Sequence, residues 1–152
     1  MTYCHLLSSS TYTAIETTVG NGMGTYRLRI RNADDELFTP IGRLLVPDYE
    51  GVLFIGAAKQ VATRGELLKD AVQRAYDVSY LPVRHHSCTR AMISSFRRMV
   101  PIDRLMLEVT PVEATRAFSH NDQAERLLIA YYRRHGEWPP MNGLMPSAGL
   151  DR

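Results

Sequence analysis

Apolar and polar residues alternate along the first half of the chain in the manner of strands. Residues 24–30, GTYRLRI, carry apolar side chains at alternate positions from Tyr26 on, which predicts a strand with one buried face. Residues 37–46, LFTPIGRLLV, form a second extended stretch that a proline and a glycine interrupt. The run VLFIG at 52–56 is continuous and apolar, as is typical of a central strand.

The period of the apolar positions then changes to that of a helix. Thr63 and Glu66 form a T-x-x-E capping box, and the stripe that follows predicts a helix over about 63–78. A second helix is predicted over about 88–99, ending before Pro101. Two successive helices therefore follow the extended stretches.

The last third of the chain returns to a strand and ends in a helix. Residues 104–110, RLMLEVT, alternate again and predict a strand. Ser119 with Asp122 predicts the start of a helix over about 120–135, and Gly136 predicts its end. This order indicates an α+β fold, in which helices flank a small, mainly antiparallel sheet of three strands plus an inserted hairpin segment.

Composition is that of one soluble globular domain. The 152 residues are 45% hydrophobic and 22% charged, and they contain no apolar run of membrane-spanning length. We expect an irregular lead-in at 1–23, one domain over 24–142 and a tail at 143–152. Cys4 and Cys88 have neither a zinc spacing nor a disulfide pattern, and from the first residues we expect no secretory signal. We therefore expect a cytoplasmic protein with reduced thiols.

The basic residues are mostly arginine and are unevenly placed. Lys59 and Lys69 are the two lysines among 18 basic residues. Residues 74–104 contain six arginines against two aspartates, a balance that can follow a phosphate backbone. The alternative interpretation is a solvated helix face. The candidate nucleic-acid ligands in this stretch are Arg90, Arg97 and Arg98.

Five short motifs, in order, resemble the GIY-YIG nuclease superfamily. Gly24–Tyr26 resembles the first tripeptide of that family and Phe54–Gly56 the second. Arg64 follows ten positions after the start of the second tripeptide, which is the family's spacing. Glu125 opens the helical stretch ERLLIAYY, and Pro139–Asn142 matches the P-x-x-N ending. The resemblance spans nearly the whole chain and implies the same order of strands and helices.

The chain departs from the family pattern between the two tripeptides. Their spacing is longer than usual, and residues 36–47 resemble an insertion found in some restriction-enzyme members. An alternative alignment puts Gly42–Leu44 in the first motif, with a more usual spacing but without the tyrosine. The sequence leaves both alignments open.

Further departures concern individual side chains of the implied site. The first tyrosine of Y-I-G is Phe54, and the lysine that often follows is Ala57, with Lys59 nearby. The histidine expected one turn after the arginine is Leu68, and His85 and His86 are the nearest imidazoles. These changes are what the decay of an active site would produce.

The resemblance implies a phosphodiesterase site with one metal ion. Glu125 is expected to bind Mg²⁺ or Mn²⁺, Arg64 to clamp the scissile phosphate, and Tyr26 to orient or deprotonate the attacking water. Each also has an ordinary interpretation, as a solvated helix Glu, a surface Arg and a packed strand Tyr. The supporting residues are Phe54, Gly56, Lys59, His85, His86 and Asn142.

Three functional interpretations follow from these residues. The first is a metal-dependent endonuclease that cuts DNA, without a membrane partner and compatible with a homodimer. The second is a degenerate member that binds nucleic acid or protein without cutting. The third is an unrelated α+β protein with a chance match. Convergence of Tyr26, Arg64 and Glu125 on one cleft is the structural test of the first.

Overall fold

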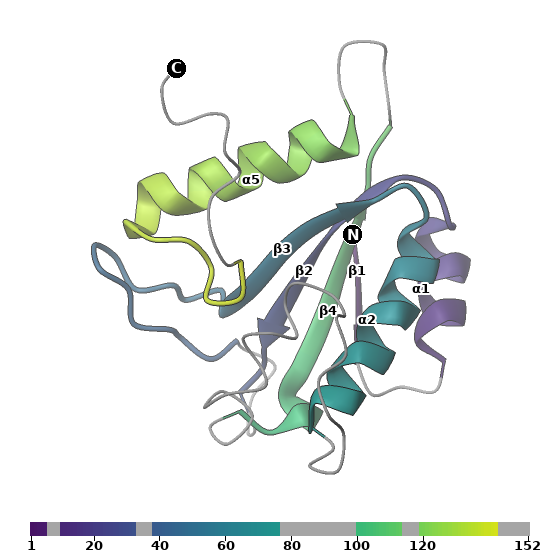
Figure 1. The fold of residues 1–152 in the computed structure, drawn as a ribbon, viewed down its shortest axis with the longest axis horizontal. Helices are drawn as coiled ribbons and strands as arrows, with labels where there is room; N and C mark the ends of the chain where they lie inside the picture. The colour runs from purple at the N-terminus through teal and green to yellow at the C-terminus, as the bar shows by residue number, and fades with distance from the viewer. Residues whose placement is uncertain (6–9, 33–37, 77–99, 114–118, 143–152) are drawn as a thin grey trace.

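The computed structural model describes residues 1–5, 10–32, 38–76, 100–113 and 119–142. The elements are, in order, β1 (Thr2–His5), α1 (Thr11–Val19), β2 (Gly24–Ile30), β3 (Val52–Ala58), α2 (Val61–Tyr76), the 3₁₀ turn η2 (Ile102–Arg104), β4 (Leu105–Pro111) and α5 (His120–His135) (Figure 1). The four strands form one antiparallel sheet in the order β1-β4-β2-β3. The α+β class with a small antiparallel sheet flanked by helices is confirmed.

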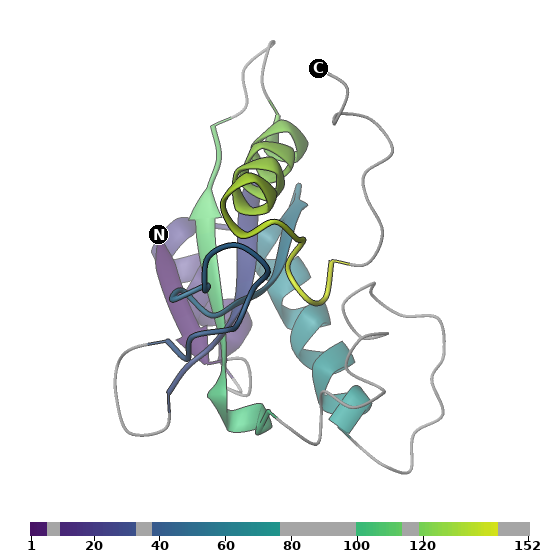
Figure 2. The same cartoon turned by 90° about the vertical axis from the view of Figure 1, so that its left-hand side faces the viewer.

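The two faces of the sheet pack against different helices. Strand alternation sends Tyr26 and Leu28 of β2 to the face that α1 and α2 cover, where they join the main hydrophobic core. Helix α5 packs on the other face, with Tyr131 against Val52 and Ile55 of β3. Figures 1 and 2 show α5 alone on its side of the sheet, with α1 and α2 together on the other. Strand β3 is thus an edge strand between α2 and α5.

The segment 1–23, expected to be irregular, contains the strand β1 and the helix α1. The strand pairs with β4, about a hundred residues further along, so its pairing is not a local property of the sequence. The helix buries only Thr11 and Ile15, too few residues for a visible apolar stripe. The sheet therefore has one strand more than the three expected.

Helix α2 lies where a helix was expected but begins differently. Its first residue is Val61, so Thr63 lies inside the first turn and does not cap it. The cap is Asn21, whose Oδ1 accepts hydrogen bonds from two backbone N–H groups of that turn at 3.0 and 3.1 Å. Glu66 pairs with Lys69 rather than reaching back to the helix start. A cap that comes from forty residues upstream cannot be found from a local motif.

The strand expected over 104–110 and the helix expected over 120–135 are confirmed as β4 and α5. Ser119 and Asp122 form the predicted capping box, and Gly136 ends the helix at a φ of 77° in the left-handed region. None of the described helices has both the length and the apolar character needed to cross a membrane. The helix expected over 88–99 lies outside the described residues.

The described part of the insertion is a loop and not the expected extended stretch. Its backbone makes two isolated bridges, Arg31 with Phe38 and Ile41 with Asp48. It is attached instead to the end of α5. The Leu45 amide donates to the His135 carbonyl over 3.1 Å, and His135 Nδ1 lies 2.6 Å from the carbonyl oxygen of Val46. The proline and glycine of this segment fit a loop better than a strand.

Candidate active site

Tyr26 and Arg64 meet on the α2 face of the sheet. Tyr26 lies opposite Gly56 in the register of β2 and β3, and its side chain is only 3% exposed. Arg64 is in the first turns of α2 and donates a hydrogen bond from Nε to the Tyr26 hydroxyl over 3.4 Å. In the described part of the chain, the Arg64 guanidinium forms no ion pair with a carboxylate. Two of the three expected catalytic side chains are therefore in contact.

Gly56 makes this contact sterically possible. A Cβ at position 56 would lie 2.6 Å from Tyr26 Cζ, 2.7 Å from its hydroxyl oxygen and 2.8 Å from Phe54 Cε1. Real Cβ atoms do not approach so closely, so the Tyr26 ring occupies space that only glycine leaves. Phe54 is buried, with its ring 5.9 Å from that of Tyr26. Both supporting residues thus hold the tyrosine in place.

The strand pairing also distinguishes the two motif alignments. Gly24–Tyr26 lies on β2, directly beside β3. Gly42–Leu44 lies in the loop before β3 and forms no part of the sheet. The tripeptide that occupies the strand next to Phe54–Gly56 is therefore the one that retains the tyrosine.

Asn142 extends the sheet at the free edge of β3. Its Oδ1 accepts from the Ile55 amide at 2.9 Å, and its Nδ2 donates to the Ile55 carbonyl at 2.8 Å. The Met141 amide donates to the Leu53 carbonyl over 2.9 Å. Met141 and Asn142 therefore satisfy backbone groups of Leu53 and Ile55 on the outer edge of β3. These hydrogen bonds do not reach Ala57, where β3 lines a pocket.

Asn142→Ala should lower the free energy of unfolding by about 1–3 kcal/mol, because both polar groups of Ile55 lose their partner. Chemical denaturation measures this. Asn121→Ala, on an exposed position of α5, is the control and should change stability by less than about 0.5 kcal/mol. Equal effects of the two changes would mean that the Asn142 side chain does not hold this edge.

Glu125 lies on the same side of α5 as Tyr132. It precedes Tyr132 by seven residues, so the two side chains lie about 20° apart around the helix axis. Tyr132 stacks on Trp138 with ring centroids 4.9 Å apart, and Trp138 leads into the segment that pairs with β3. Glu125 is partly buried, and no hydrogen bond or ion pair connects it to Tyr26, Arg64 or another described residue. It touches neither of them, so the three expected catalytic side chains do not converge on one cleft among the described residues.

A pocket of about 590 Å³ opens where β3, α2 and α5 meet. It carries the cations Lys59 and Arg64 on its wall and no carboxylate. The lining residues are Ala57, Ala58, Lys59, Gln60, Thr63, Arg64, Leu67 and His120. The expected supporting residue Lys59 is exposed at this pocket, next to the expected phosphate clamp.

His120 lines this pocket and was not among the residues expected from the sequence. It is 6% exposed and lines the pocket from the first turn of α5. Its Nδ1 is buried with no hydrogen-bond partner among the described residues. The available signal was its position directly after the Ser119 cap, in the first turn of the helix.

Comparison of the chain with protein-family models, with curated proteins and with solved structures found no match.

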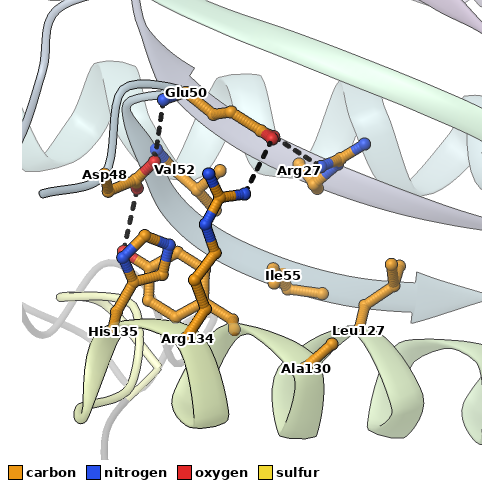
Figure 3. A pocket seen from close by; sticks show the side chains of 10 residues that line it. Arg27, Asp48, Glu50, Val52, Ile55, Leu127, Ala130, Arg134 and His135 are labelled. Atoms are coloured by element: carbon orange, nitrogen blue, oxygen red, sulfur yellow. Dashed lines mark hydrogen bonds and ion pairs between the residues drawn. The ribbon is translucent and has the colours of Figure 1, made fainter. Parts of the chain in front are cut away.

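A smaller pocket, of about 150 Å³, lies against the other end of α5 (Figure 3). Arg27 and Arg134 both point to Glu50, with nitrogen–oxygen distances of 3.1 and 4.0 Å. These charges are paired with one another, in contrast to those at the larger pocket. The smaller pocket therefore has fewer unpaired charges with which to bind a charged ligand.

Asp48 closes the smaller pocket on its inner side. Its carboxylate accepts hydrogen bonds from the amides of Glu50 and Val52 and from the Tyr131 hydroxyl, each at 2.8 Å. Burial, together with the hydrogen bond to Asp48, raises the pKa of Tyr131 well above its ordinary value. The hydroxyl therefore stays protonated and fastens the loop to α5.

The remaining expected residues cannot be compared with the fold. His85, His86, Arg90, Arg97 and Arg98 lie outside the described residues. Within the described ranges, no group of three or more His, Cys, Asp or Glu side chains is placed to hold a metal. Glu125 is a single carboxylate, which fits a Mg²⁺ ion that takes its other ligands from water and substrate oxygens.

Proposed function

We propose that the protein is a GIY-YIG-type endonuclease that hydrolyses DNA phosphodiester bonds with the help of Mg²⁺ or Mn²⁺. The observation that carries this proposal is the hydrogen bond between Tyr26 and Arg64 across Gly56. The family resemblance selects these three residues from two strands and a helix, and they lie together in the fold. A chance match of short motifs gives no reason for such contacts.

Arg64 acts on the scissile phosphate, and Tyr26 acts on the attacking water. The guanidinium of Arg64, which no described carboxylate neutralises, binds the oxygens of the scissile phosphate and stabilises the charge that develops on them. The Tyr26 hydroxyl is held beside this cation and orients the attacking water. A cation at that distance also stabilises negative charge on the phenolic oxygen as a proton moves.

Glu125 is the residue that holds the divalent cation. Its carboxylate is partly buried and has no competing cationic partner among the described residues. When bound, the metal supplies a Lewis acid for the phosphoryl oxygens and a more acidic water. The protein contributes one ligand, so we expect metal affinity to be weak without substrate.

A plasmid-nicking assay tests the proposal. Wild-type protein should nick supercoiled DNA with Mg²⁺ or Mn²⁺ and not in EDTA. Arg64→Ala should reduce the rate by at least about 100-fold, because one stabilising donor to a developing charge is worth that much. Arg133→Ala, at an exposed position in the last turn of α5, should cut at the wild-type rate. A wild-type protein that never cuts with either metal contradicts the proposal.

One observation favours a second candidate function, nucleic-acid binding without cleavage. Phe54 has no hydroxyl where the family has a tyrosine, and its ring is buried in the core beside Tyr26. A protein of this kind would bind DNA in EDTA and never nick it. Phe54→Tyr would then leave the absence of cleavage unchanged, whereas in an active enzyme it should keep or raise the rate.

A further inference from the structure

The first turn of α2 is held by the two residues that follow α1 and Gly20. The amides of the first three residues of a helix have no carbonyl partner within the helix itself. Asn21 Oδ1 accepts from the second and third of these amides in α2, at 3.0 and 3.1 Å. The Gly22 carbonyl accepts from the first, the Val61 amide, over 3.0 Å. All three amides are therefore satisfied from outside the helix.

Arg64 is the next residue of that turn. Its amide makes the first hydrogen bond of helical spacing, to the Gln60 carbonyl over 3.0 Å. Gln60 therefore has the N-cap position, where glutamine is not a favoured residue, and Asn21 supplies the acceptor instead. Helix ends fray, and a cation in the first turn opposes the helix dipole. The turn that carries Arg64 thus depends on a cap from another segment.

Helix α1 in turn fixes the position of Asn21. The residue comes just after the end of α1, and its Nδ2 donates to Thr63 Oγ1 over 3.0 Å. A Cβ at Gly65 would lie 2.6 Å from Ile15 Cδ1 of α1, so the two helices touch at the residue after Arg64. Figure 1 shows α1 and α2 side by side. The capping residue and the capped turn are therefore parts of one packed unit.

We propose that Asn21 is a positioning residue for Arg64, whose guanidinium it keeps against the Tyr26 hydroxyl by fixing the first turn of α2. The inference rests on the proposed function, because that function gives Arg64 its role at the scissile phosphate. The contact of Arg64 Nε with the hydroxyl, at 3.4 Å, is long for a hydrogen bond, so a small shift of the helix start breaks it. A displacement of about 1 Å can cost about 100-fold in rate.

Asn21→Ala should lower kcat for plasmid nicking about 10–100-fold and change KM little. The guanidinium serves the charge that develops in the transition state, whereas KM reflects contacts along the whole DNA. Loss of the cap should also lower Tm by about 2–4 °C. In an Arg64→Ala background, Asn21→Ala should lower Tm by the same amount and cause no further loss of rate.

Tyr76→Phe is the matched control at the far end of α2. The Tyr76 hydroxyl donates to the Val100 carbonyl over 2.8 Å, so this change also removes a hydrogen bond that holds the helix. Position 76 lies about 18 Å along the helix axis from Arg64. The control should lower Tm and leave kcat unchanged. An unchanged kcat for Asn21→Ala, an equal loss in the control, or an undiminished loss in the Arg64→Ala background would overturn the proposal.

The position of Arg64 can also be followed without cleavage. Its Nε–Hε signal in a ¹H–¹⁵N NMR spectrum, assigned by its absence from Arg64→Ala, should move in Asn21→Ala and stay in place in Tyr76→Phe. In a protein that never cuts DNA, this result would support the positioning role and contradict the nuclease activity. An Arg64 signal that stays in place in Asn21→Ala would overturn the positioning role, whether or not the protein cuts DNA.

Discussion

Glu125→Gln should lower the rate of DNA cleavage by about 1,000-fold or more and leave the fold and metal-free DNA binding intact. The glutamine retains the shape of the side chain but removes the charge that attracts Mg²⁺. Metal stabilisation of phosphoryl charge is worth several kcal/mol, which is three or more powers of ten in rate. The residue has no ion pair with a described side chain, so its loss should cost little stability.

The measurement combines plasmid nicking, Tm and binding of a DNA duplex in EDTA. Glu113→Gln is the control, since Glu113 is an exposed glutamate beyond β4, away from the β3 edge, and should cut at the wild-type rate. Excess Mn²⁺ should restore part of the activity if the substitution weakens metal affinity. Wild-type rates from purified Glu125→Gln would remove Glu125 from the metal site.

Glu108→Gln should cause the largest loss of stability, about 3–5 kcal/mol, because it leaves buried arginine charge without its partner. The Glu108 side chain is 1% exposed on β4. Its two carboxylate oxygens lie 2.8 Å from Arg27 Nη2 and 2.7 Å from Arg29 Nη1 of the adjacent strand. Natural domains are stable by about 5–15 kcal/mol, so a substantial part of the protein should unfold at moderate temperature.

Glu50→Gln is the matched control for this prediction. Glu50 also contacts Arg27 and Arg29, at 3.1 and 3.7 Å, but its side chain is 49% exposed. An exposed ion pair is worth about 0–1 kcal/mol, so urea denaturation should show a small effect for Glu50 and a large one for Glu108. Similar losses of stability for the two substitutions would mean that burial does not determine how much these ion pairs contribute.

Local patterns in the sequence were sufficient where the determining residues are neighbours in the chain. Helix α5 has its capping box, its apolar stripe and its terminal glycine within eighteen residues, and it begins and ends where expected. The alternation in β2 and β4 likewise identified the strands. Of the proposed site, the sequence suggested Tyr26 and Arg64, through motifs that resemble those of the GIY-YIG family. The contact between Tyr26 and Arg64, and the need for glycine at position 56, depend on the register of β2 and β3.

Only the tertiary structure decided the features that depend on distant partners. Strand β1 forms because it can pair with β4. Helix α2 begins at Val61 because Asn21, in the loop before β2, caps its first turn. The Asn142 side chain can bond the Ile55 backbone only because β3 lies at the edge of the sheet. His120 lines a pocket with Lys59 and Arg64 only because folding brings the start of α5 to the residues between β3 and α2. Burial and pairing are properties of the packed chain, so no local pattern carries them.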